Sequence, residues 1–331
     1  MKSTLLVAIL FLVTLATALW LLGVFEPAPD APPVAPTPTP AAAPPDLAPP
    51  DLAESEPRAE PAPDVPEVPA VVRVMVLGES PRSFTMWLPI LWKLEPRIQW
   101  QMWLAESAAS SVQTHADSVP PLAGKPTASD LDAVGVLVLA GVDPARFDDA
   151  FWARVAEKVK AKSLGLLVLA EHRFARAYAE HAALKDLLPV RGVKPVAPIA
   201  PGSQVIAGVF DEPKRFVVTD AGRRHPASRI VPYPGWSVRH WDAQAGGTSG
   251  WTTKFVAPAE GPAADAAVLV EVDTGAGRVP AFLASSGEGA RVLWIGGFFD
   301  LERPAYSGSA AYDRARALAV AWVAWLAGLI G

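Results

Sequence analysis

The sequence of 331 residues contains no cysteine. Disulfide bonds, thiolate metal sites and every mechanism that needs a cysteine nucleophile are therefore excluded. Histidine is scarce as well: there are five, and none forms the H-x-x-x-H or H-E-x-x-H spacing that binds zinc from one face of a helix. We expect neither a metal nor a cofactor.

The chain also lacks a block of basic residues. Its net charge of -5 is an average over two different parts. Residues 26–70 carry nine acidic residues and one arginine, whereas residues 71–331 carry 27 basic and 25 acidic residues. Without a basic patch there is no electrostatic basis for nucleic-acid binding, and none is expected.

One long apolar run is present, at the N-terminus. It covers residues 4–25 and is interrupted only by two threonines, which is long enough for a helix to cross a bilayer. A cleavable signal would have a shorter apolar region; residues 16–18 offer a cleavage site, but the apolar run continues beyond them. Lys2 before the run and acidic residues after it orient the segment. We predict an uncleaved single-pass anchor over residues 1–25 in the inner (cytoplasmic) membrane, with the C-terminal domain extracytoplasmic.

Residues 26–70 contain 16 prolines and no aromatic residue. Such a segment cannot bury enough apolar surface to offset the entropy lost on ordering. Polyproline II geometry, at about 3.1 Å per residue, would give a reach of about 140 Å. We predict a disordered, Pro-rich linker that acts as a spacer; a docking site for a proline-recognition partner is the alternative.

From residue 71 onward, short apolar runs alternate with amphipathic segments, which predicts an α/β domain over residues 71–331. The first half indicates a mostly parallel sheet with helices on both faces, and the Ser-Ser-Gly-Glu-Gly turn between the last two strands indicates an antiparallel extension. Strands are predicted at residues 71–77, 98–106, 133–141, 164–170, 215–220, 266–273, 278–286 and 290–297. Helices are predicted at residues 83–96, kinked at Pro89, after Asp143-Pro144, and at residues 312–330.

The last of these helices starts with three charged residues, and its apolar part is short for a bilayer. We therefore expect it to pack on the sheet. The tryptophans within regular elements are expected in the core; they are Trp87, Trp92, Trp294, Trp322 and Trp325.

Ligands of open parallel sheets bind beyond the carboxyl ends of the strands, and polar residues follow several of the predicted strands. Candidate ligand-binding residues are Glu79, Arg82, Asp143, Arg173, Arg223 and Arg224, the last two in a predicted loop. If the protein is an enzyme, the candidate catalytic residues are Glu171, His172, His225 and Asp300. Ser285 and Ser286 lack the G-x-S-x-G pattern of a serine hydrolase.

Several segments occur in a familiar order. They are VMVLGESPRSFTMWLPILWKLEPRIQWQMWL (74–104), VGVLVLAGVDPARF (134–147), GLLVLAEHRFARAY (165–178), VVTDAGRRHPASRI (217–230) and ARVLWIGGFFD (290–300). In this order they resemble the glutamine-amidotransferase-like domain of bacterial membrane-associated proteins, a relative of the class I glutamine amidotransferases. The resemblance covers most of residues 71–327 and implies a flavodoxin-like fold.

In class I amidotransferases, the strand that corresponds to residues 165–170 is followed by a cysteine, which pairs with a distant histidine and glutamate. This chain has Ala170, Glu171 and His172 there. The resemblance therefore implies an active-site corner whose nucleophile is missing, and glutamine amidotransferase activity is not expected.

These observations favour a non-catalytic binding or scaffolding module in an envelope-associated assembly. Relatives of the domain often accompany von Willebrand-type domains, so the resemblance implies an envelope protein partner. Two alternatives stay open: a hydrolase or transferase that uses Glu171 and His172, and a glycan-binding module that uses Trp236, Trp241 and Trp251.

Overall fold

The computed structural model describes the C-terminal part of the chain with several gaps. The described residues are 71–79, 88–89, 91–92, 95–106, 113–114, 122, 124–170, 173–194, 209–228, 252–257, 259–285, 290–297 and 310–330. The predicted anchor and linker, residues 1–70, lie outside them. Within the described ranges, no helix is both long and apolar enough to cross a membrane.

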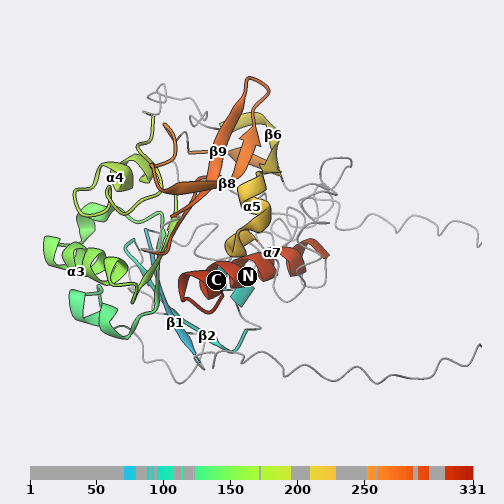
Figure 1. Ribbon diagram of the computed structural model, residues 1–331. Coiled ribbons are helices and arrows are strands. Elements are labelled where there is room, and N and C mark those ends of the chain that lie inside the picture. Colours follow the sequence, from blue (N-terminus) through green and yellow to red (C-terminus); the bar gives the residue numbers. More distant parts are fainter. Residues whose placement is uncertain are drawn as a thin grey trace, which may run out of the picture. The chain divides into compact units, whose positions relative to one another are not determined.

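The described strands form a single mixed sheet (Figure 1). Its order is β3-β2-β1-β4-β5-β10-β9-β8-β6-β7. The strands are β1 (Val72–Gly78), β2 (Ile98–Leu104), β3 (Gln113–Thr114), β4 (Val136–Ala140), β5 (Gly165–Leu169), β6 (Val209–Val218), β7 (Thr252–Phe255), β8 (Ala266–Asp273), β9 (Arg278–Ser285) and β10 (Val292–Ile295).

The strands β2, β1, β4, β5 and β10 are mutually parallel, and the remaining pairs are antiparallel. Numbered along the chain, the parallel strands have the order 2-1-3-4-5, which is the order of flavodoxin-like sheets. The predicted parallel core with an antiparallel extension is confirmed. The predicted turn after β9 joins it to its antiparallel neighbour β10, as expected for a hairpin.

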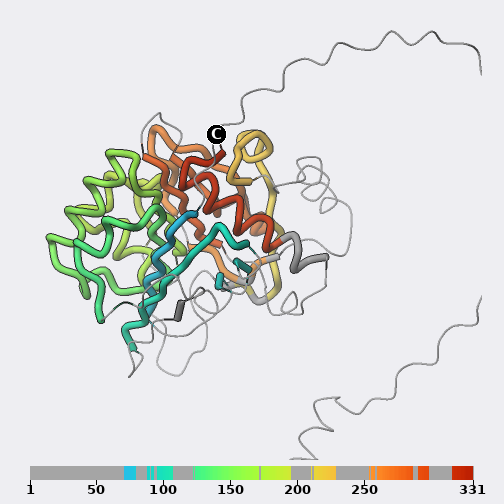
Figure 2. Tube along the Cα trace, turned by 90° about the horizontal axis from the view of Figure 1, so that it is seen from below, coloured from blue at the N-terminus to red at the C-terminus, as the bar shows by residue number. Residues whose placement is uncertain are grey.

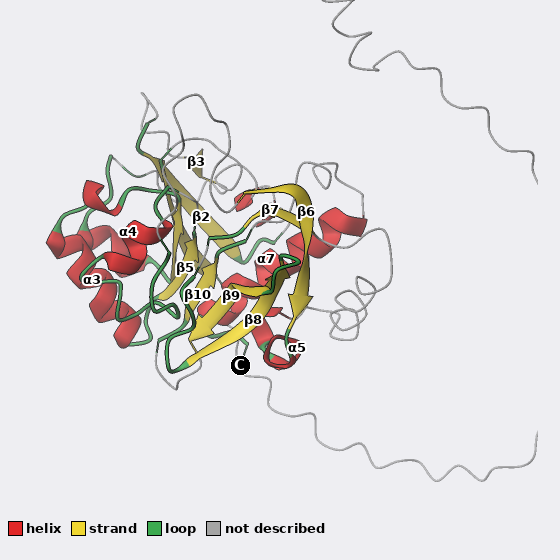
Figure 3. Ribbon diagram, turned by 90° about the horizontal axis from the view of Figure 1, so that it is seen from above, coloured by secondary structure: helices red, strands yellow, loops and turns green. Residues whose placement is uncertain are grey.

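Alternate residues of the parallel strands enter two separate cores. In β1, Val74 and Val76 belong to one core, and Met75 and Leu77 to the other. The first core includes residues of α7 (Ala310–Leu326), and the second includes residues of α3 (Asp149–Lys160) and α4 (Ala175–Glu180). Helices therefore cover both faces of the sheet (Figures 1 and 3). Burial on both faces explains why these strands are continuous apolar runs in the sequence.

The C-terminal helix packs on the sheet, as predicted. The tube in Figure 2 shows it beside the first two strands, although they lie at the opposite end of the domain sequence. The indole Nε1 of Trp92 donates to the Ala319 carbonyl oxygen of this helix at 3.2 Å. Trp294, Trp322 and Trp325 are buried too, whereas Trp87 lies outside the described residues.

Two predictions about helix ends were wrong. Asp143 does not start the long helix: it caps the short 3-10 turn η2 (Pro144–Arg146), and α3 begins afterwards with Asp148 as its N-cap. Arg223 and Arg224 do not lie in a loop. They belong to α5 (Asp220–Arg224), which starts after Thr219 because the Thr219 hydroxyl accepts a hydrogen bond from the Gly222 N–H at 2.9 Å and caps the helix.

Two further short elements precede β4 and follow α5. They are the 3-10 helices η1 (Ala128–Ala133) and η3 (Pro226–Ser228). The apolar residues of the segment after Asp143 face the core: Phe151, Val155 and Val159 of α3 are buried, and so is Phe147, which precedes the N-cap of this helix.

The start of β5 leaves no space for a side chain. A Cβ at Gly165 would lie 2.5 Å from the Leu326 carbonyl oxygen and 2.6 Å from the Leu326 Cβ. At Gly135, the residue before β4, a Cβ would meet nothing closer than 3.7 Å. We predict that Gly165→Ala lowers the free energy of unfolding by about 1–3 kcal/mol through overpacking, whereas Gly135→Ala changes it by no more than about 1 kcal/mol. Denaturant titration measures both, and equal losses would contradict the packing of α7 on β5.

Candidate functional site

The candidate site lies at the carboxyl ends of β1 and β4. These two neighbouring parallel strands form the point at which the strand order changes direction, because the chain leaves β1 toward β2 and later returns to β4 on the other side. In sheets of this kind the crevice at that point is where ligands bind. The first residue after β1 is Glu79. After β4, Gly141 adopts a left-handed conformation (φ 71°), which turns the chain toward Asp143.

Glu79 is buried, and its carboxylate is fully engaged by the loop after β4. It accepts a hydrogen bond from Arg146 Nε at 2.7 Å and a close second contact from Arg146 Nη2. The backbone N–H of Asp143 donates to its other oxygen at 3.2 Å. The Asp143 side chain accepts from the Ala145 N–H at 2.9 Å, which holds the turn that carries Arg146. The loop after β4 is therefore built around the Glu79 carboxylate.

The charge on Glu79 is stabilised despite its burial. Burial by itself opposes ionisation, but the hydrogen bonds from Arg146 and Asp143, and the positive charges of Arg146 and Arg173, hold the Glu79 pKa below its ordinary value. The pKa of Arg146 changes in the opposite direction. The hydrogen bond to Glu79 raises it, and the negative charges of Asp143 and Glu106 nearby raise it further. The result is a mixed-charge cluster in which Glu79 is the buried member.

This arrangement does not suit acid–base catalysis by Glu79. A general base works best when its pKa lies near the operating pH, whereas the surroundings of Glu79 move its pKa further below that range. Its oxygens are also occupied by Arg146 and Asp143. The cluster instead fixes the loop and leaves the exposed Arg173 and Glu106 and the partly exposed Arg146 facing outward at the sheet edge.

Three of the residues singled out from the sequence come together here: Glu79, Asp143 and Arg173. Arg146, the central partner of Glu79, was not among the candidates. The signal that could have found it is the Asp143-Pro144 turn, because the N-capped 3-10 turn ends on Arg146 and places it back over the end of β1.

Arg223, Arg224 and His225 do not join this cluster. The two arginines are exposed in the last turn of α5, where positive charge suits the negative end of the helix. The His225 ring lies 4.7 Å from the Trp325 ring of α7, and its Nδ1 accepts from the Ala227 N–H at 3.2 Å. These residues belong to the α7 side of the sheet, opposite α3 (Figure 1). The expectation that they share one rim with Glu79 was wrong, because α5 packs on β8 rather than on the parallel core.

The remaining candidates lie outside the described residues. They are Arg82, Glu171, His172 and Asp300, together with Trp236, Trp241 and Trp251 of the glycan-binding alternative. Where the chain is described, no group of three or more histidine, aspartate and glutamate side chains is arranged to hold a metal ion.

No family model and no curated protein matches the sequence. Solved structures do match. A ThuA-like protein from Bacteroides uniformis is 11% identical over 82% of this chain and 95% of its own, with a TM-score of 0.45. A ThuA-like protein from Parabacteroides merdae is 12% identical over 78% and 91%, with a TM-score of 0.45. A glutamine amidotransferase is 13% identical over 76% and 98%, with a TM-score of 0.37. The matches include a glutamine amidotransferase, the class of protein that the sequence resembles, and these similarities are weak.

The ion pair predicts a pH-dependent contribution to stability. Because the folded pKa of Glu79 is lower than its ordinary value of 4.5, folding favours the ionised form. This stabilisation is complete above pH 4.5 and is lost as the pH falls through the folded pKa. We predict that Arg146→Gln costs about 1–2 kcal/mol at pH 7, a range lowered for the partial exposure of Arg146, and that the cost shrinks below pH 4.

The control is Arg176→Gln, which removes the exposed Arg176–Glu180 pair of α4 and should cost no more than about 0.5 kcal/mol. Urea titrations between pH 3 and pH 7 compare the two variants with the wild type. A cost for Arg146→Gln that does not change over this range would show that the charge pair is not the source of the effect.

Proposed function

We propose that this protein is a non-catalytic binding or scaffolding module, held outside the cytoplasmic membrane by an N-terminal helix and a Pro-rich tether. The observation that supports the proposal most is the occupied switch point: the Glu79 carboxylate is bound by Arg146 and the Asp143 N–H at the place where enzymes of this topology receive their ligands. The absence of cysteine removes the thiolate chemistry of class I amidotransferases.

The same sheet edge supports a role in recognition. The buried Glu79 carboxylate neutralises the positive charge of Arg146, whereas Arg173 and Glu106 are exposed at the strand ends. Exposed charges of mixed sign select partners by complementary charge and by repulsion of wrong ones. We infer an envelope protein partner that presents charged groups to this edge.

The tether contributes to the proposed role through geometry. An anchored domain on a spacer searches only a shell next to the membrane, so its effective concentration toward a membrane-associated partner is high. The spacer length sets the distance at which a partner can be reached, and shortening it would restrict the partners within range.

Catalytic assays test the first half of the proposal. We predict that the full-length protein releases no ammonia from glutamine, and that a panel of amide and ester substrates is not turned over above background. Treatment with iodoacetamide should change nothing, because no thiol is present. Turnover that is lost in Glu171→Ala would contradict the proposal and would favour the hydrolase or transferase alternative.

Affinity capture tests the second half. Full-length protein, cross-linked in cells and recovered from detergent-solubilised membranes, should retain a partner that is lost when the exposed charge at the sheet edge is reversed by Arg173→Glu. The matched control is Arg176→Glu, which reverses another exposed positive charge three residues further along the chain, in α4. Equal recovery from the two variants would place the partner surface elsewhere.

A further inference from the structure

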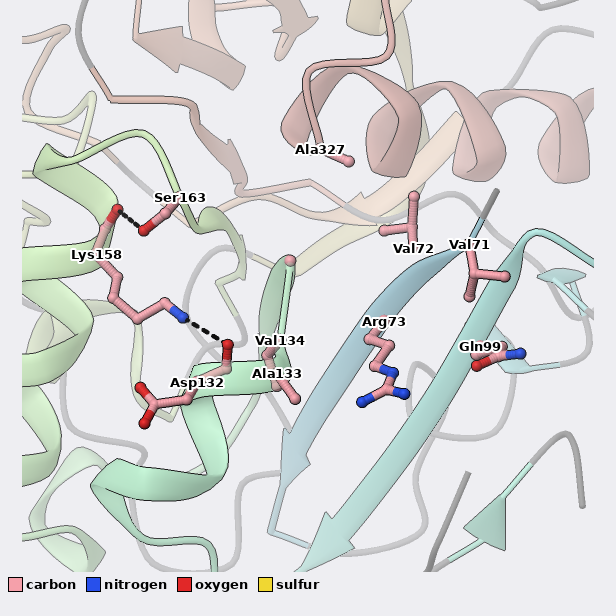
Figure 4. Close-up of a pocket in the computed structure, with 11 residues that line it drawn as sticks. Val71, Val72, Arg73, Gln99, Asp132, Ala133, Val134, Lys158, Ser163 and Ala327 are labelled. Atoms are coloured by element: carbon pink, nitrogen blue, oxygen red, sulfur yellow. Dashed lines mark hydrogen bonds between the residues drawn. The ribbon is translucent and has the colours of Figure 1, made fainter. Parts of the chain in front are cut away.

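A second site lies at the opposite edge of the parallel sheet, near the amino ends of β1, β2 and β4. A pocket of about 700 Å³ opens there beside the end of α3. Its volume falls within the range of small-molecule pockets, about 300–1,000 Å³. Figure 4 shows Lys158 and Asp132 on one side of this amino-edge pocket, and Arg73 and Gln99 on the other.

The strand pattern explains why the pocket is polar on one wall. Residues 73 and 99 are paired across β1 and β2, so their side chains lie on the same face of the sheet. Along β1 this face continues with Met75 and Leu77, which are covered by the α3 side of the core. The start of β1 is not covered by this core, and the residue on the same face there is the exposed Arg73 instead of an apolar residue.

Lys158 is the second unusual feature of this pocket. Among the described residues, only Glu79 and Lys158 are both charged and buried, and Lys158 is 8% exposed. Its ammonium donates to the carbonyl oxygens of Leu131 at 2.7 Å and Asp132 at 3.2 Å. An ammonium has three N–H donors, so these two carbonyls leave one donor for a further acceptor.

The two acidic side chains whose charges act on Lys158, Asp132 and Glu157, do not form ion pairs with it. The carboxylate of Asp132 binds Arg154 at 2.6 Å, and Glu157 binds the same guanidinium at 2.8 Å. Burial lowers the pKa of Lys158, and the charges of Asp132 and Glu157 offset this in part. Within the described residues, no carboxylate forms an ion pair with Arg73 or Lys158. The pocket therefore presents two cationic side chains, and the one carboxylate in its lining, that of Asp132, is paired with Arg154 instead.

We propose that the amino-edge pocket binds a small organic ligand through a carboxylate group, with Arg73 and Lys158 as the anion-binding residues. The planar guanidinium of arginine matches a carboxylate with two parallel hydrogen bonds, and the ammonium supplies a point charge. The apolar part of the lining, formed by Val71, Val72, Val134 and Ala327, suits a short aliphatic body. This site is independent of the binding role proposed above for the carboxyl edge.

The test uses succinate as the probe and the full-length protein in detergent. Isothermal titration calorimetry at low salt should show one site with a dissociation constant of about 10 mM or tighter. Arg73→Gln should weaken binding about tenfold or more, since it removes the paired charge-assisted hydrogen bonds. The matched control is Lys160→Gln, which removes a positive charge from the same end of α3 without touching the pocket and should change binding less than twofold.

A second readout avoids substituting Lys158, whose loss would leave two carbonyl groups unpaired and endanger folding. Succinate should slow the acylation of Lys158 by an amine-reactive ester, followed by mass spectrometry, and leave Lys160 unaffected. Absence of succinate binding, equal weakening in the two variants, or binding of inorganic phosphate with no binding of succinate would each overturn the proposal. Each of these results would leave the proposed scaffolding role untouched, because they do not involve the carboxyl edge.

Discussion

Burial of the parallel strands on both faces is the constraint on which the rest of this structure depends. Alternate residues of β1 and β4 enter two different cores, and helices cover both. An ionised group without a partner is strongly destabilising between the sheet and its helices, so charged residues are confined to the two edges where the strands begin and end. The only described residues that are both charged and buried follow this rule: Glu79 stands at the carboxyl edge, and Lys158 lines the pocket at the amino edge.

The buried charges at the two edges of the sheet have different partners, and both proposals depend on this difference. At the carboxyl edge, Glu79 has a guanidinium and a backbone N–H as internal partners, so its charge is satisfied without a ligand. At the amino edge, Lys158 has only neutral carbonyl oxygens as hydrogen-bond partners, and its acidic neighbours are bound to Arg154. A charge that is paired with an opposite charge fixes the structure, whereas a buried charge whose hydrogen-bond partners are all neutral favours the binding of an anion.

Much of the domain fold was predictable from the sequence, because the strands are buried on both faces and their apolar runs are unmistakable. The hairpin of the last two strands and the C-terminal helix were also predictable. Local capping was harder: the new helix at α5 depends on one threonine side chain, and the pair of N-caps at Asp143 and Asp148 divides what the sequence suggested was one helix.

The candidate site was predictable only in part. Strand ends identified Glu79 and Asp143, because ligands of parallel sheets bind there. The role of Arg146 depends on how a 3-10 turn folds back over β1, and periodicity does not carry that information. His225 was misplaced because its neighbour in space, Trp325, is 100 residues away in the sequence. The amino-edge pocket was missed because the topology of a parallel sheet directs attention to the carboxyl ends of the strands, whereas this pocket lies at their amino ends.

The buried Glu79 carboxylate at the switch point is ionised at neutral pH and internally paired, and the rest of the account depends on this. The most direct measurement is a carbon-13 NMR titration of the Glu79 side-chain carboxyl group in the full-length protein. A midpoint below the ordinary value of 4.5 is the result that this structure predicts. A midpoint raised toward neutrality would contradict it, since a carboxyl group that exchanges protons near pH 7 is suited to acid–base catalysis.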